Sequence, residues 1–150
     1  MYGLSFEIPI PRGFPLLKIL QYSIAKKYNW YVVDSQNDTW DYHMEHLLFE
    51  RTIYEGSAFY EKIQQEHFVI FLKLQAYFYN DPIDEILSYD DFCKSKCQLL
   101  LLINDCTHAE LYIKDKTVLA DTYQHLLSNG FCNVCYIDES NDRRVKMSVT

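Results

Sequence analysis

Two pairs of side chains in this chain have the spacing of metal ligands. His43 and His46 are three positions apart, and Cys93 and Cys97 are four positions apart. Residues at these spacings share one face of a helix, and imidazole and thiolate are groups that zinc prefers. If the two pairs meet in the fold, His43, His46, Cys93 and Cys97 predict a tetrahedral zinc site. The competing interpretation is structural, because a free cysteine often packs as a small hydrophobic residue.

Three further thiols are candidates for redox or nucleophilic chemistry. Cys132 and Cys135 have the spacing of a zinc knuckle or a redox dithiol. Their neighbours have the pattern of a strand, in which residues three apart point to opposite faces, whereas a redox pair is expected at the start of a helix. Cys106 and His108 could act as nucleophile and base only if a tight turn brought them together. We therefore expect these thiols to be structural.

Acidic and basic side chains supply the remaining candidates. Four aspartates could gather at one end of a sheet and bind a divalent cation, namely Asp105, Asp115, Asp138 and Asp142. Each also stands where a turn or a helix cap needs a carboxylate, which is the commoner use. Arg143 and Arg144 could hold an anion, or they could pair with a nearby carboxylate. The four glycines are isolated from one another, so a glycine-rich phosphate loop is excluded.

The charge and length of the chain exclude several classes of function. Its 150 residues include 14 Lys and Arg against 21 Asp and Glu, a formal charge of −7, which disfavours a nucleic acid partner. No apolar run approaches the roughly 20 residues that cross a bilayer, and the N-terminus lacks a basic targeting segment. Five cysteines at irregular spacing predict reduced thiols. We expect a cytoplasmic protein without a membrane partner.

The elements that would position these groups are organised around residues 99–103. Five consecutive aliphatic residues stand there, as in a strand that is covered on both faces, so we place this strand at the centre of a sheet. Alternation predicts other strands at residues 3–8, 30–33, 68–79, 107–113, 131–137 and 145–149. Helical spacing predicts helices at residues 13–28, 58–65, 88–96 and 115–128. Residues 34–38 read as a polar loop, and residues 39–50 fit either a helix or a strand.

Together these elements predict an α+β or α/β fold, in a single domain of residues 1–150. We expect a mixed sheet of about six to eight strands with three to four helices. The chain opens with strand, helix and strand, and it closes with a β-hairpin, a helix and a second β-hairpin. In the long strand, one side carries apolar residues at even positions from 68 to 78. The other side is expected to form a half-polar face, with Lys73, Gln75 and Tyr77.

Three segments carry a resemblance to a known family. They are Gly3-Leu4-Ser5-Phe6-Glu7-Ile8-Pro9, Leu101-Leu102-Ile103-Asn104-Asp105-Cys106, and the end from Gly130-Phe131 through Asn141-Asp142-Arg143-Arg144. The chain resembles, over essentially its whole length, a family of small uncharacterised proteins from Bacillus-type bacteria. The resemblance implies a single bacterial cytoplasmic domain, and it implies no activity or functional residues.

The acidic charge, the 13 tyrosines and the lack of an assembled catalytic set predict a non-enzymatic protein-interaction module. Its partner would be a basic protein, as for an immunity or inhibitor protein, or a second copy in a homodimer. One alternative is a small zinc protein or enzyme that uses the four candidate ligands. Another is a regulatory domain that binds a small ligand in a pocket beside the strand at residues 68–79. Whether the protein is an enzyme stays open, and zinc is the one cofactor considered.

Overall fold

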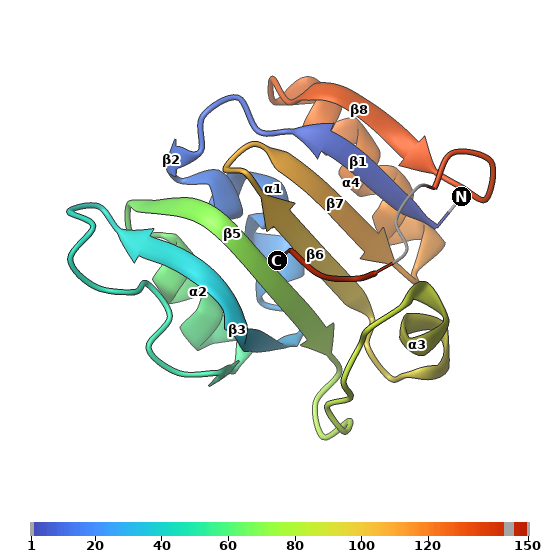
Figure 1. Cartoon of the computed structure of the whole chain (residues 1–150), viewed down its shortest axis with the longest axis horizontal. Coiled ribbons are helices and arrows are strands. Elements are labelled where there is room, and N and C mark those ends of the chain that lie inside the picture. The colour runs from blue at the N-terminus through green and yellow to red at the C-terminus, as the bar shows by residue number, and fades with distance from the viewer. Residues whose placement is uncertain (1, 143–145, 150) are drawn as a thin grey trace.

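The computed structural model describes residues 2–142 and 146–149 (Figure 1). Its strands are β1 (Gly3–Glu7), β2 (Arg12–Gly13), β3 (Asn29–Asp41), β4 (Ile53–Tyr54), β5 (His67–Tyr77), β6 (Leu99–Asn104), β7 (His108–Ile113) and β8 (Cys132–Ile137). Its helices are α1 (Pro15–Ala25), α2 (Gly56–Ile63), α3 (Tyr89–Lys94) and α4 (Lys116–Ser128). None of the helices within these described residues is long and apolar enough to cross a membrane.

The eight strands form one sheet in the order β4-β3-β5-β6-β7-β1-β8, and β2 pairs with β5 outside this path. Every strand pairing within the described residues is antiparallel. β7 and β8 nevertheless run in the same direction, because β1 lies between them and pairs with both. α4 connects these two strands, as expected for a long crossover. The predicted α+β class is confirmed.

β6 lies at the centre of the sheet, as its sequence predicts. Leu99, Leu101 and Ile103 are buried in one hydrophobic core, on the side of α1, α2 and α4. Leu100 and Leu102 are buried in a second core on the opposite side. Because residues 99–103 of β6 offer no polar side chain to water on either face, both faces of the sheet have to be covered by protein there.

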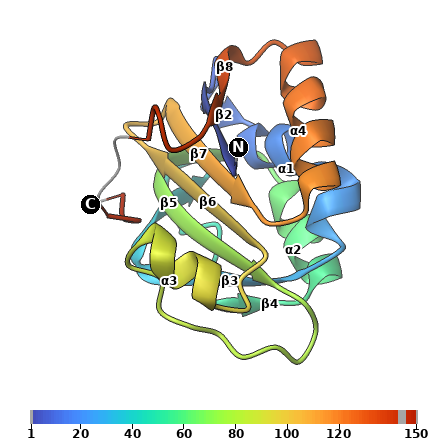
Figure 2. The ribbon, with the colours of Figure 1, turned by 90° about the vertical axis from the view of Figure 1, so that its right-hand side faces the viewer.

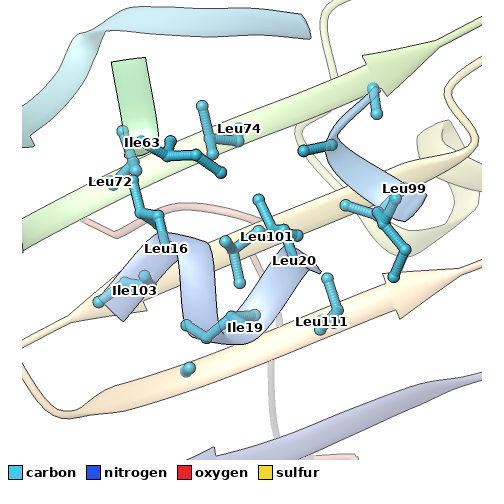
Figure 3. Packing of buried hydrophobic residues seen from close by; sticks show 14 of the residues in the cluster. Leu16, Ile19, Leu20, Ile63, Leu72, Leu74, Leu99, Leu101, Ile103 and Leu111 are labelled. Carbon is cyan, nitrogen blue, oxygen red and sulfur yellow. The ribbon is translucent and has the colours of Figure 1, made fainter. Parts of the chain in front are cut away.

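Helices α1, α2 and α4 cover the first face (Figure 2). Leu16, Ile19 and Leu20 of α1 point onto the sheet, where they meet leucines of β5, β6 and β7 (Figure 3). All three are completely buried. Burying one such side chain contributes about 1.5–3 kcal/mol, so this helix is an important part of the core.

The second face is covered by α3, by the irregular segment at residues 78–88 and by the C-terminal tail at residues 146–149. Figure 2 shows α3 on the side of the sheet opposite to the other helices. Ile86 of the irregular segment, Phe92 of α3 and Met147 of the tail are buried together against this face. Most of the second cover is therefore neither helix nor strand.

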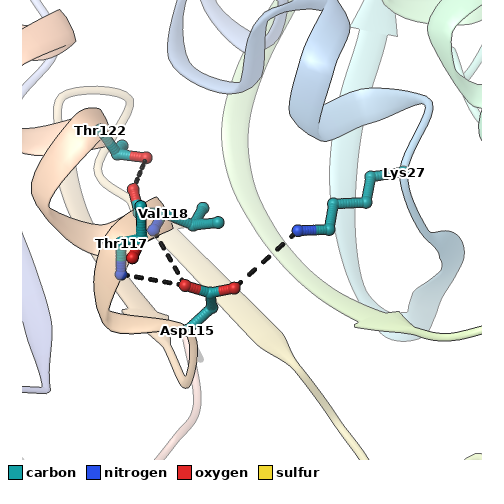
Figure 4. Close-up of polar contacts among 5 residues, drawn as sticks. All are labelled: Lys27, Asp115, Thr117, Val118 and Thr122. Carbon is teal, nitrogen blue, oxygen red and sulfur yellow. Dashed lines mark hydrogen bonds and ion pairs between the residues drawn. The ribbon is translucent and has the colours of Figure 1, made fainter.

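Local signals placed the starts of α3 and α4 correctly, whereas α2 begins two residues before its predicted start and α1 ends at Ala25 instead of residue 28. One carboxylate oxygen of Asp115 accepts hydrogen bonds from the backbone N–H groups of Thr117 and Val118, at 2.9 and 3.1 Å (Figure 4). Its other oxygen lies 4.0 Å from the ammonium of Lys27, a residue between α1 and β3 (Figure 4). The hydroxyl of Thr122 donates to the carbonyl of Val118 at 2.7 Å. Asp115 thus caps α4 as predicted, and it also lies within ion-pair distance of the turn that follows α1.

The strand predictions fail where the sheet is irregular. β3 continues to Asp41 through residues 34–38, which had the composition of a loop. In β5, Asp38 pairs with Phe71 and Thr39 pairs with Val69, so Ile70 is an extra residue in a β-bulge. The bulge reverses the alternation, and Val69 is fully buried where Phe68 and Ile70 were expected to be.

Two other segments also differ from the prediction. Residues 42–50 contain no helix, and a single bridge joins Trp40 to Leu47. The closing strand expected at residues 145–149 is absent from residues 146–149, while residue 145 lies outside the described residues. The second hairpin therefore does not form there. Instead the tail crosses the second face of the sheet.

The buried histidine of the first face predicts how stability depends on pH. His67 is completely buried; its Nε2 accepts a hydrogen bond from the Leu16 N–H at 3.2 Å, and its Nδ1 donates to the Gln65 carbonyl at 2.7 Å. Burial lowers the pKa of His67 below its ordinary value of 6.5, so the folded state holds the neutral ring. The contribution of His67 to the free energy of unfolding is present in full above pH 6.5. It is lost as the pH falls towards the folded-state pKa, by up to about 1.4 kcal/mol per pH unit.

Urea unfolding between pH 7.5 and 5, on the wild type and His67→Gln, measures this contribution. The unfolding free energy of the variant should fall less steeply with acid, because Gln does not titrate. His43→Gln removes an exposed histidine and serves as the matched control, with the slope of the wild type. Equal slopes for the wild type and His67→Gln would contradict the assignment.

Candidate functional site

A row of three polar side chains is buried on the second face of the sheet. Lys73, Gln75 and Tyr77 alternate along β5, and each is at most 2% exposed. Their alternation is the predicted half-polar face, but the structure covers this face completely. Buried polar groups need hydrogen-bond partners, because an unpaired one costs about 1–3 kcal/mol. The partners of this row therefore determine what lies above it.

The row holds the backbone of the irregular segment. The Lys73 ammonium donates to the carbonyl of Ile86. The Gln75 amide donates to the carbonyl of Asp84 at 2.9 Å and to the Tyr77 hydroxyl at 2.7 Å. That hydroxyl accepts from the N–H of Asp84 at 3.1 Å and donates to its carbonyl at 3.2 Å. Burial raises the pKa of Tyr77, so the phenol keeps the proton that it donates.

A large bulge in β3 lies opposite this row. Val32 pairs with Leu74, and the next paired residues are Asn37 and Leu72. Residues 33–36 of β3 therefore face a single residue of β5, Lys73. Such a mismatch bends the longer strand away from its partner, and bulges of this kind are common beside functional sites.

A cavity of about 510 Å³ lies between the bulge and the irregular segment. We call it the bulge pocket. Its lining comes from β3, from the polar row of β5 and from the irregular segment: Tyr31, Val33, Asp34, Ser35, Gln36, Lys73, Gln75, Ile83, Asp84, Glu85, Ile86 and Leu87. Its volume lies in the range of about 300–1,000 Å³ that ligand pockets occupy. It is also beside the long strand, where the small-ligand hypothesis expected a pocket.

The mouth of the bulge pocket is acidic and apolar. Asp34, Asp84 and Glu85 all line the pocket and are exposed. Beside them, the side chains of Ile83 and Leu87 are 41% and 58% exposed, which is high for residues of this type. The arrangement suits a ligand that combines a cationic group with apolar surface.

The four predicted zinc ligands lie in separate surroundings. His43 and His46 are exposed in the turn after β3, where His46 Nδ1 lies 3.3 Å from an oxygen of Asp41. Cys93 is exposed on α3, whereas Cys97 is buried and its thiol donates to the carbonyl of Leu99 at 3.2 Å. Burial raises the pKa of Cys97 to about 11, which disfavours the thiolate that zinc needs.

Residues 2–142 and 146–149 contain no group of three or more His, Cys, Asp or Glu side chains placed to hold a metal ion. The structure therefore does not bring the four zinc candidates together. The zinc hypothesis remains a prediction from spacing alone.

The other thiols take structural positions, with one surprise. Cys132 and Cys135 were expected on opposite faces of a regular strand. They pair with Glu7 and Ser5, which are two residues apart in β1, so a bulge puts both thiols on the same face of β8. Both are exposed and free. A nearby left-handed residue, Asn133 with φ 53°, accommodates the bulge.

Cys106 lies in the turn between β6 and β7, and its φ of 66° is left-handed. Its backbone N–H donates to the carbonyl of Ile70, which ties the turn to β5. Burial raises the pKa of its thiol, and the charges of Asp105 and Asp38 add to the effect. A raised pKa disfavours the thiolate that a nucleophile needs, so the pairing of Cys106 with His108 as nucleophile and base gains no support.

Three of the four candidate aspartates stand in turns or caps as their positions suggested, whereas Asp142 contacts the distant Tyr2. Asp105 belongs to the turn after β6, with a φ of 52°, and Asp115 caps α4. Asp138 accepts from the N–H and hydroxyl of Ser140, and Asp142 accepts from the hydroxyl of Tyr2 at 2.7 Å. The carboxylates of Asp115, Asp138 and Asp142 thus have hydrogen-bond partners in the protein. Arg143 and Arg144 lie outside the described residues.

Comparison with known proteins agrees with the whole-chain resemblance seen in the sequence. A family model with the description "Protein of unknown function (DUF2691)" matches residues 1–148. The chain is 30% identical over 155 aligned positions to "Uncharacterized protein YncE" from Bacillus subtilis (strain 168), and the alignment covers 98% of each chain. No solved structure matches the chain. The expected resemblance to uncharacterised Bacillus proteins is confirmed.

The hydrogen bonds of the polar row predict how a substitution there changes the stability of the pocket wall. Tyr77→Phe removes the acceptor for the Asp84 N–H, which we expect to cost about 1–3 kcal/mol of unfolding free energy. Amide hydrogen exchange at Asp84 should also accelerate, because the N–H of Asp84 donates to the hydroxyl that is lost. Tyr79→Phe is the matched control, since Tyr79 is 75% exposed and should change neither quantity. Equal effects of the two substitutions would contradict this role.

Proposed function

We propose that this chain, which belongs to the family described as protein of unknown function DUF2691, is a non-catalytic module that binds a basic segment of a partner protein. The bulge pocket is the proposed site. The single observation that carries the proposal is the composition of its mouth, where Asp34, Asp84 and Glu85 stand beside exposed Ile83 and Leu87. Carboxylates at such a mouth attract Lys or Arg, and the aliphatic side chains gain by burial under a partner.

Charge and apolar surface contribute differently to such binding. An exposed ion pair stabilises a complex by only about 0–1 kcal/mol, so the three carboxylates mainly orient the partner and speed its approach. The formal charge of −7 acts in the same direction over a longer range. Most of the affinity has to come from burial of apolar surface at Ile83 and Leu87, at about 25 cal/mol per Å².

A second candidate is supported by the depth of the bulge pocket. Its volume of about 510 Å³ would also suit a small ligand, with Lys73 and Gln75 at its buried end. In that case the carboxylates of the mouth would select a small cationic or zwitterionic compound. Competition by free lysine in the peptide experiment below separates the two candidates, because a small-ligand site gains little from a peptide of nine residues.

A cytoplasmic location is part of the same proposal. All five cysteines lie within the described residues, and all five are free. Free thiols fit a reducing compartment, in which disulfides are rare. A basic intracellular protein is accordingly the kind of partner that we propose.

Peptide binding tests the proposal directly. Fluorescein-labelled peptides of nine residues, with zero to four Lys or Arg beside aliphatic residues, should bind more tightly as their positive charge increases. The affinity should fall as salt is raised from 50 to 500 mM, because salt screens exposed charges. Asp34→Lys combined with Glu85→Lys should weaken binding by roughly tenfold, about 1.4 kcal/mol.

Asp121→Lys is the matched control, since Asp121 is an exposed carboxylate of α4, on the other side of the sheet. It should leave the affinity within twofold of the wild type. The proposal would be wrong if acidic and neutral peptides bound as well as basic ones. It would also be wrong if the Asp121 variant lost as much affinity as the variant of the mouth.

A further inference from the structure

The C-terminal tail joins the two walls of the bulge pocket. The backbone N–H of Met147 donates to the carbonyl of Leu87 at 3.0 Å, on the irregular wall. The hydroxyl of Ser148 and the backbone N–H of Val149 both donate to the side-chain oxygen of Gln36, at 3.0 and 2.8 Å, on the bulge. Leu87 and Gln36 themselves line the pocket. The tail therefore crosses from one wall to the other.

Met147 is the main anchor of the tail, and the partly buried Val149 packs against the same core. Met147 is 1% exposed, and it packs in the second core with Ile86 of the irregular wall and Leu100 of β6. The tail also donates hydrogen bonds to the walls from the backbone N–H groups of Met147 and Val149 and from the hydroxyl of Ser148. An extended segment held by backbone hydrogen bonds and one buried apolar side chain is a common form of peptide recognition. The walls thus already bind a peptide, which is part of the same chain.

The composition of the tail matches the partner proposed above. Lys146 precedes the buried Met147, so the bound segment combines a cationic residue with an apolar anchor. The mouth of the pocket offers carboxylates and exposed aliphatic side chains to the same region. A basic partner segment and the tail would use the same acceptors at Gln36 and Leu87, so both cannot be bound there at once.

We propose that residues 146–149 act as an autoinhibitory strap, which occupies the walls of the bulge pocket until a basic partner segment displaces it. This inference rests on the proposed function, because it names the regulation of the same site. A tail attached to the chain competes at an effective concentration in the millimolar range. Only molecules with a released tail can bind the partner. The apparent association constant is therefore the intrinsic constant multiplied by the fraction of such molecules.

A peptide with the sequence of residues 142–150 provides the probe, used in fluorescence polarisation against full-length protein. The wild type should bind this labelled peptide weakly, because its own tail occupies the site. Met147→Asp should bind it at least tenfold more tightly, because a carboxylate cannot replace the buried anchor. Met44→Asp is the matched control, since Met44 is 37% exposed and lies in the turn after β3. It should behave as the wild type does.

A second measurement does not depend on any variant folding well. Unlabelled peptide is added in excess to ¹⁵N-labelled wild-type protein, and the amide resonances of Met147 and Val149 are followed. Displacement of the tail should move both resonances to random-coil positions. The strap is wrong if they remain in place while the peptide binds, or if Met147→Asp binds the peptide no more tightly than the wild type.

The two proposals fail in different ways. If the tail peptide binds Met147→Asp but unrelated basic peptides do not bind it, the occupation of the site by the tail is supported and the proposal of a basic partner is contradicted. If unrelated basic peptides bind the wild type and Met147→Asp equally well, the partner site stands and the strap is wrong.

Discussion

The burial of residues 99–103 in β6 is the constraint on which the rest of the structure depends. A strand with five consecutive aliphatic residues cannot leave either face of its sheet in water. Helices α1, α2 and α4 cover one face with amphipathic surfaces, which is the ordinary solution. The other face is covered mainly by irregular chain, from residues 78–88 and from the tail. Irregular backbone leaves its own polar groups without the partners that a helix or strand would supply.

The polar row of β5 solves this second problem. Lys73, Gln75 and Tyr77 replace the aliphatic residues that a dry interface would have, and they bind the backbone at residues 84–86. The bulge pocket lies beside this row. The bulge at residues 33–36 moves β3 away from β5, and the irregular segment that the row holds forms the opposite wall. Cover, polar row and pocket are therefore consequences of one requirement.

A pocket built in this way is suited to binding and to regulation. Its irregular wall is held by a few side chains rather than by a ladder of backbone hydrogen bonds, and such regions rank low in local stability. Its charged groups are at the mouth, where they would attract the proposed partner without the large cost of burying an unpaired charge. The tail completes the walls from the same chain, so a partner that used the same acceptors, as we propose, would be coupled to release of the tail.

The sequence by itself determined the elements whose causes are local. The aliphatic run of β6, the caps at Ser88 and Asp115 and the alternation of Lys73 with Gln75 depend on residues a few positions apart. The tertiary structure alone decided that the alternating row would be buried, that residues 33–36 would be a bulge rather than a loop, and that the tail would bind Gln36. These features depend on contacts between segments as far as 113 residues apart, and local periodicity carries no information about such contacts.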